Sequence, residues 1–320
     1  MSLQSRAWLT LSALVVSAAT LVAGRAAQQK PRFVSGVDTV SASVTVHQGN
    51  LPVTGLKPED FAITDNGVPQ TADFVSDDSL PMDLTLLLDA SGSVLPMMDQ
   101  LKADVLETSA MLHDDDRVRV IAFTDTVVEM SPFQPATSEL LIDRLPVMGM
   151  TSIYHAAAAA MMRTRSPDRH ELVVLFTDGS DTSSTIGGAT VLDIARRSDA
   201  ILDIFIVTMA PGLPSLSARD TYANMAPRGW LPFVDEFPPA TRDWLDKSAT
   251  TTGGQLQDIF GEAHVPRGLK AAIDDMHTSY IVYFTPKTVA KPGWHDIKFK
   301  LKRPGDFSIR ARKGYFGPAK

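Results

Sequence analysis

The stretch from residue 83 to residue 93 reads Asp83-Leu84-Thr85-Leu86-Leu87-Leu88-Asp89-Ala90-Ser91-Gly92-Ser93. Its apolar first part, Leu84 to Leu88, is typical of a strand that is covered on both faces in a parallel sheet. A carboxylate and two hydroxyls, from Asp89, Ser91 and Ser93, follow that strand directly. Open α/β sheets bind ligands at the carboxyl ends of their strands, so the stretch predicts an α/β fold with a binding site at that edge.

Strands and helices alternate on the carboxyl side of this stretch. Glu171 to Phe176 and Leu202 to Thr208 are further apolar strands, and residues 117–123 alternate as a strand before a hairpin to 127–130. Helices are predicted at residues 97–112, 156–162, 189–197, 243–250 and 263–278. The order predicts a doubly wound, mostly parallel sheet over residues 80–278.

Both flanks of this α/β region favour β structure. Residues 31–78 contain the period-two segment Val40 to Val46 and the turn signals Gly49-Asn50 and Asp65-Asn66-Gly67, which indicate about four strands. Residues 279–317 return to the same alternation. We hypothesise that the two flanks pack on each other as one small sandwich-like domain.

Residues 211–242 interrupt the α/β pattern. They are rich in proline and aromatic residues, and the stretch is too long for an ordinary connection in a compact domain. We interpret it as an insertion. It either caps the fold as a surface loop or acts as a partner-contact or lid element, because long loops often carry function.

The composition excludes several classes of protein. The formal net charge of −7 argues against a nucleic-acid partner, which requires a concentrated excess of lysine and arginine. The chain has 0 cysteines, so disulfides, thiolate metal sites and a cysteine nucleophile are excluded. Apolar residues make up 44% of the chain, which is ordinary for a protein with a buried core.

The first residues resemble an export signal. Arg6 is followed by an apolar run from Ala7 to Ala23 and by the small residues of Gly24-Arg25-Ala26-Ala27. We expect residues 1–26 to be a signal peptide, with the protein exported to the periplasm or outside the cell. An uncleaved anchor helix is the alternative, and no later segment is long and apolar enough to span a membrane.

Two more polar positions are predicted to join the site after the first strand. Thr151 comes just before the alanine-rich helix, and Asp178 follows the strand that ends at Phe176. Gly92 permits the turn that lets Asp89, Ser91 and Ser93 converge. Hard oxygen ligands of this kind suit Mg²⁺, Mn²⁺ or Ca²⁺, with Mg²⁺ the first expectation.

In this order, Asp-x-Ser-x-Ser, a downstream threonine and a strand-ending Thr-Asp-Gly resemble the metal-ion-dependent adhesion site of von Willebrand factor A (VWA) domains, which have a Rossmann-like fold. The resemblance covers about Pro81 to Thr278. It implies that the two serines and the threonine coordinate the metal and that the two aspartates bind it directly or through water. In this chain those residues are Asp89, Ser91, Ser93, Thr151 and Asp178. Met150 stands where the family often has glycine.

The flanks extend the resemblance to about residues 33–317. Pro58-Glu59-Asp60-Phe61 before the α/β region and Arg310-Ala311-Arg312-Lys313-Gly314-Tyr315-Phe316 after it are similar to an exported bacterial subfamily of VWA-related proteins that is abundant in Acidobacteria. This resemblance indicates how the domains are arranged, but it says little about the function of the protein.

The function that these features imply is a non-enzymatic, metal-dependent protein-binding or adhesion module. Neutral hydroxyls and only two carboxylates leave the cation underneutralised and one coordination position open, which an Asp or Glu carboxylate of a partner protein can fill. Two alternatives remain open at this stage. One is a metal-assisted hydrolase in which His155 or Asp181 helps to activate water. The other is an envelope scaffold with a vestigial metal site and contacts made by the insertion.

Several other residues that could bind a cation or act in catalysis are interpreted as structural. We expect Asp114-Asp115-Asp116 to be a solvated turn rather than a cation site, and His155 to have a surface or packing role. His170-Glu171 lacks the second histidine of the metalloprotease helix. The chain also lacks a Gly-x-Ser-x-Gly elbow around Ser91, so no residue is predicted to be catalytic.

Overall fold

The computed structural model describes residues 39–77, 80–92, 94, 98–140, 142, 149–162, 168–208, 240–260, 265–287 and 292–317. All of them belong to one unit, Val37–Lys320. The expected signal at 1–26, Ser93 and residues 211–239 of the insertion lie outside the described residues.

A six-stranded sheet lies at the centre of the α/β region. Its strand order is β11-β10-β9-β6-β7-β8. The strands are β6 (Met82–Asp89), β7 (Arg117–Phe123), β8 (Val127–Pro135), β9 (His170–Thr177), β10 (Ile201–Thr208) and β11 (Leu256–Phe260). The first five strands in this order pair in parallel, whereas β8 is antiparallel to β7. The fold is therefore mixed α/β, with a mostly parallel sheet.

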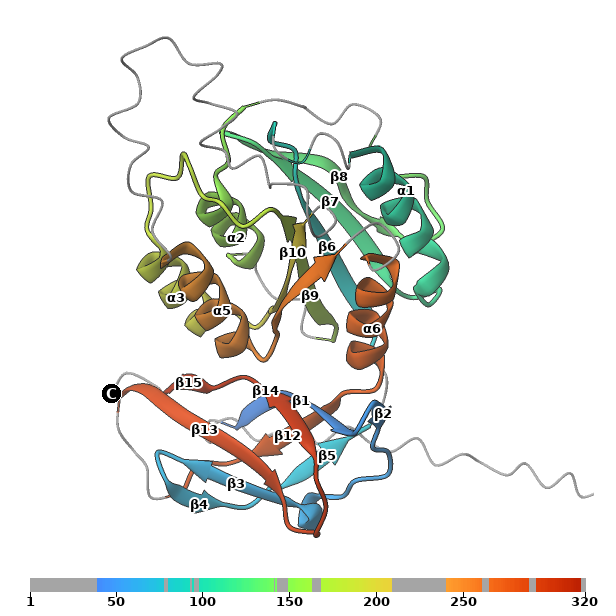
Figure 1. The fold of residues 1–320 in the computed structure, drawn as a ribbon. Coiled ribbons are helices and arrows are strands. Elements are labelled where there is room, and N and C mark those ends of the chain that lie inside the picture. Colours follow the sequence, from blue (N-terminus) through green and yellow to red (C-terminus); the bar gives the residue numbers. More distant parts are fainter. Residues whose placement is uncertain are drawn as a thin grey trace, which may run out of the picture. The chain divides into compact units, whose positions relative to one another are not determined.

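Helices cover both faces of this sheet (Figure 1). They are α1 (Met98–Thr108, continued by a 3₁₀ turn at Ser109–Met111), α2 (Ile153–Met161), α3 (Gly188–Arg197), α5 (Ala240–Thr252) and α6 (Val265–His277). Successive side chains of a strand point to opposite faces. Leu86 and Leu88 of β6 accordingly pack with α1 and α6, whereas Leu87 packs with α2, α3 and α5. This two-sided burial explains why every residue of β6 is buried.

The two β flanks form two further sheets. One has the order β14-β1-β12-β5 with β2 paired to β1, and the other has the order β15-β13-β3-β4. The strands before the α/β region are β1 (Val40–Gln48), β2 (Leu51–Pro52), β3 (Phe61–Asp65), β4 (Val68–Gln70) and β5 (Phe74–Ser76), with a 3₁₀ turn at Pro58–Asp60. Those after it are β12 (Tyr280–Phe284), β13 (Gly293–Leu301), β14 (Ser308–Ala311) and β15 (Gly314–Gly317).

Each flank sheet contains strands from both ends of the chain. β1 pairs with β12, and β3 pairs with β13, in both cases antiparallel. Buried residues of the two sheets, among them Val44, Phe61, Tyr280 and Phe299, belong to one hydrophobic cluster. The period-two alternation of β13, in which His295, Ile297 and Phe299 are buried, provides the inward face.

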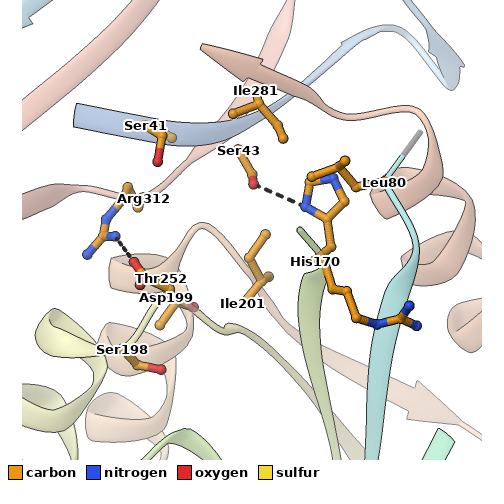
Figure 2. Close-up of a pocket in the computed structure, with 12 residues that line it drawn as sticks. Ser41, Ser43, Leu80, His170, Ser198, Asp199, Ile201, Thr252, Ile281 and Arg312 are labelled. Atoms are coloured by element: carbon orange, nitrogen blue, oxygen red, sulfur yellow. Dashed lines mark hydrogen bonds and ion pairs between the residues drawn. The ribbon is translucent and has the colours of Figure 1, made fainter. Parts of the chain in front are cut away.

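Polar contacts join the flank sheets to the α/β region. Arg312 Nη1 lies 2.9 Å from Asp199 Oδ1, and Ser43 Oγ lies 3.5 Å from His170 Nδ1; both pairs line the small pocket in Figure 2. Asp275 of α6 pairs with Arg310 of β14. The chain runs from the end of α6 into β12 within three residues, so α6 connects the two regions covalently.

Replacing Gly254 with alanine should lower the free energy of unfolding by roughly 1–3 kcal/mol, because an added methyl group would overpack the site. A Cβ at Gly254 would lie 2.1 Å from the carbonyl oxygen of Leu202 in β10, which is backbone and has little freedom to withdraw. Urea denaturation measures the change. Gly187→Ala is the control, since a Cβ there meets no atom within 4 Å. Equal losses in both variants would contradict the steric argument.

Candidate functional site

Asp89 ends β6 and is completely buried. Its Oδ1 accepts a hydrogen bond of 2.9 Å from the backbone N–H of Ser91, and its Oδ2 accepts one of 2.7 Å from the hydroxyl of Thr177. The Ser91 side chain also donates to this carboxylate. The Asp89 carboxylate is thus held by neutral donors from the ends of two neighbouring strands, β6 and β9.

Burial, and after it the negative charge of Asp178, raise the pKa of Asp89 to about 7, although hydrogen bonds from Ser91 and Thr177 act in the opposite direction. An unfavourable negative charge at this position favours a bound cation. Two carboxylates beside the serine hydroxyl are the hard oxygen donors that Mg²⁺, Mn²⁺ and Ca²⁺ prefer. The residues therefore fit a divalent cation.

Thr151 is buried and fastened to the loop that follows Asp178. Its N–H donates to Thr182 Oγ1 at 2.8 Å, and its carbonyl oxygen accepts from the N–H groups of Thr182 and Ser183 at 2.8 and 3.0 Å. Ser91 is thus hydrogen-bonded to Asp89, and the charge of Asp178 acts on the Asp89 carboxylate. Thr151 is hydrogen-bonded to the loop that follows Asp178. Ser93 lies outside the described residues.

The Gly149-Met150 step before Thr151 has a specific backbone requirement. Gly149 has a φ of +133°, and a Cβ there would lie 3.2 Å from Thr124 Cβ and from Asp125 Oδ1. The loop after β7 therefore packs against this glycine. Met150, which stands where the family often has glycine, is 43% exposed. It presents apolar surface beside Thr151.

Asp181 and His155 hold the start of α2. Asp181 Oδ2 accepts from the N–H of Tyr154 at 2.9 Å, where the N-cap residue Ser152 makes no side-chain cap. The ring Nε2 of His155 lies 2.9 Å from Thr185 Oγ1. The loop of residues 178–185 is therefore bound to α2, and these contacts agree with the packing role expected for His155.

Two features were not predicted from the sequence. Thr177 binds Asp89, and its signal was its place beside Asp178 in the Thr-Asp-Gly motif. The prediction that Asp114-Asp115-Asp116 is a solvated turn is wrong for Asp116, which is only 1% exposed. Burial alone would raise the pKa of Asp116, but hydrogen bonds from His277, Met82 and His113 hold it below its ordinary value.

An α/β sheet with helices on both faces and acidic and hydroxyl side chains at its carboxyl edge is typical of a VWA-type domain. The family model described as "VWA domain containing CoxE-like protein" matches residues 64–228, slightly more than half of the 320 residues. The chain belongs to this family.

Several solved structures are similar. BatB, a conserved hypothetical protein from Bacteroides thetaiotaomicron, has 15% identity and a TM-score of 0.43 over 61% of this chain and 98% of that chain. A von Willebrand factor type A protein from Catenulispora acidiphila has 12% identity and a TM-score of 0.47 over 88% and 75%. The pilus adhesin SpaC from Lactobacillus rhamnosus GG has 10% identity and a TM-score of 0.45 over 86% and 48%. No curated protein sequence matches the chain.

Proposed function

We propose that this protein is a metal-dependent protein-binding module. Asp89, Ser91, Ser93, Thr151 and Asp178 would hold one divalent cation, with Mg²⁺ the first candidate. The observation that carries the proposal is the pair of carboxylates, Asp89 and Asp178: the burial of Asp89, and after it the charge of Asp178, raise the pKa of Asp89 to about 7. Membership of the VWA family supports it, since such domains often mediate protein interaction or adhesion.

Each residue has a distinct part in this proposal. Asp89 supplies a buried carboxylate whose orientation Thr177 and the Ser91 N–H maintain. Asp178, which is partly exposed, supplies the second negative charge. When bound, the cation supplies the attraction for a carboxylate of the partner. Exposed Met150 offers apolar contact beside that position.

The same proposal covers location and architecture. We infer that residues 1–26 direct export to the periplasm or cell exterior, that residues 80–278 form the VWA domain as a doubly wound unit, and that the two flanks (31–78 and 279–317) form a small β domain. Within the described ranges, no helix is both long and apolar enough to cross a membrane. The motifs in the two flanks support the assignment of the chain to the exported subfamily of VWA-related proteins.

A non-enzymatic role is part of the proposal. The hydrolase alternative needs His155 or Asp181 to activate water, but the described contacts of both residues fasten the loop of residues 178–185 to α2. These contacts give both residues a structural task. The adhesion role needs no proton transfer from either of them.

Calorimetric titration with Mg²⁺, Mn²⁺ and Ca²⁺ tests the proposal. We expect one ion per chain, with affinity at least about tenfold weaker in Ser91→Ala and Thr151→Ala, since each variant loses an oxygen donor. Thr250→Ala is the matched control, because the Thr250 hydroxyl bonds only the backbone of its own helix among its described contacts.

The partner's carboxylate can be represented by acetate. We expect added acetate to tighten Mg²⁺ binding, since it can fill the open coordination position. If none of the three ions binds with or without acetate, or if Ser91→Ala and Thr151→Ala both bind like the unchanged protein, the metal-dependent role is wrong.

A further inference from the structure

A second group of side chains that are able to ligate a metal lies at the other end of β6. His113 and Asp116 are in the turn before β7, and His277 is the last residue of α6. Each offers a ligand atom, and these atoms lie within 4.8 Å of one another. Met82, which begins β6, donates to Asp116 Oδ1 at 2.7 Å. Asp89 ends the same strand about 23 Å away, at about 3.3 Å per residue, so the two sites are separate.

Asp116 organises this group. Its Oδ2 accepts from the N–H of His113 at 2.8 Å and lies 2.8 Å from His277 Nε2. The hydrogen bond to this buried carboxylate restrains the orientation of the His277 ring. The side chain of His277 is only 9% exposed, so its ring is already confined.

The two imidazole rings lie against each other. The ring centroids of His113 and His277 are 3.8 Å apart, and the ring planes are inclined by 9°. Two imidazoles with one carboxylate are a donor set for Zn²⁺ and similar transition ions, whereas Mg²⁺ and Ca²⁺ prefer oxygen alone. The chemistry of this group therefore differs from that of the Asp89 site.

Solvent and ions can reach the group. An open pocket of about 560 Å³ is lined by His113 and His277 together with His47, Asp274 and Asp275. Asp275 is engaged by His47 and Arg310, while Asp274 pairs with the exposed Lys270. The pocket gives an ion and its bound waters an entry path, which a functional metal site requires.

We propose that His113, Asp116 and His277 form a second cation site, specific for an imidazole-preferring transition ion such as Zn²⁺, with water completing the coordination. The in-plane lone pairs of two parallel rings cannot meet at one point, so binding requires one ring to leave the stack. His113 is exposed and can rotate, whereas His277 is confined. The ion would join the turn before β7 to the end of α6, three residues before β12.

Zn²⁺ titration of the purified protein tests this site. Excess Mg²⁺ is present throughout to occupy the oxygen site at Asp89. We expect one Zn²⁺ per chain and at least about tenfold weaker binding in His113→Ala, which removes a ligand whose side chain is exposed and whose loss leaves the core intact. Asp114→Asn is the matched control in the same turn and should bind Zn²⁺ like the unchanged protein.

Asp89→Asn distinguishes this site from the proposed function. Zn²⁺ binding should persist in that variant, even if the Asp89 site binds no metal at all. The proposal is overturned if the unchanged protein binds no Zn²⁺, if His113→Ala binds it with unchanged affinity, or if Asp89→Asn abolishes binding.

Discussion

Asp89→Asn should abolish Mg²⁺ binding and at the same time raise the free energy of unfolding of the metal-free protein at pH 8 by up to roughly 4 kcal/mol. The pKa of Asp89 rises from 3.8 to about 7, chiefly through burial and then through the charge of Asp178. The ionised carboxylate is therefore unfavourable in the folded protein at pH 8. Asparagine keeps the shape and can still accept from Ser91 N–H, but it carries no charge to bind the cation.

The sign of the pH dependence follows from the direction of this shift. A carboxyl group whose pKa is raised by folding binds more protons in the folded than in the unfolded protein between about pH 4 and pH 7. Its contribution to stability is full below pH 4 and is lost as the pH rises through 7. The advantage of Asp89→Asn should therefore be absent near pH 4, grow up to pH 7 and stay constant above it.

Urea denaturation of the metal-free proteins at pH 4.5 and pH 8 measures this difference. Asp114→Asn, which removes an exposed carboxylate outside both sites, should change stability by less than about 0.5 kcal/mol at either pH. Added Mg²⁺ should stabilise the unchanged protein and the control but not Asp89→Asn. A variant that is less stable than the unchanged protein at pH 8 would show that the Asp89 charge is already compensated.

The fold was predictable where burial imposes a clear pattern. β6, β9 and β10 are covered on both faces and therefore have mainly apolar sequences, and β13 alternates because only one of its faces is buried. β11 was not predicted, because its sequence Leu-Gln-Asp-Ile-Phe has neither pattern. It forms by parallel pairing with β10, and the sequence of β11 alone gives no sign of this pairing.

Polar residues were likewise predictable only where a local sequence pattern marks their position. Asp89 and Asp178 could be predicted because each directly follows a recognisable strand, and parallel strands end at one edge of the sheet. Asp116 could not, since its burial depends on His277, which is 161 residues away, and on Met82 in another strand. A run of three aspartates is usually solvated, and only tertiary contacts distinguish the third from its neighbours.

Asp83→Ala should lower the free energy of unfolding by about 3 kcal/mol, the lower end of the range for breaking a buried ion pair. Asp83 is the second residue of β6 and is 1% exposed. Its carboxylate accepts from Arg117 Nε and Nη2 at 2.8 and 2.6 Å and from Arg169 Nε at 2.5 Å. Alanine leaves both guanidinium groups without this acceptor, although Arg117, 36% exposed, recovers part of the loss from water.

Asp193→Ala provides the matched comparison for this loss. Asp193 pairs with Arg197 on α3, but both side chains are more than half exposed, so the variant should lose less than about 0.5 kcal/mol in urea denaturation. If Asp83→Ala loses no more than Asp193→Ala, the two arginines find other acceptors in the folded protein. Asp83 and Asp89 lie at opposite ends of β6 and should give opposite results: the first variant loses stability and keeps its Mg²⁺ affinity while folded, whereas Asp89→Asn gains stability and loses the metal. This contrast would show that the Asp83 carboxylate stabilises the folded protein, whereas the Asp89 carboxylate costs stability and serves to bind the metal.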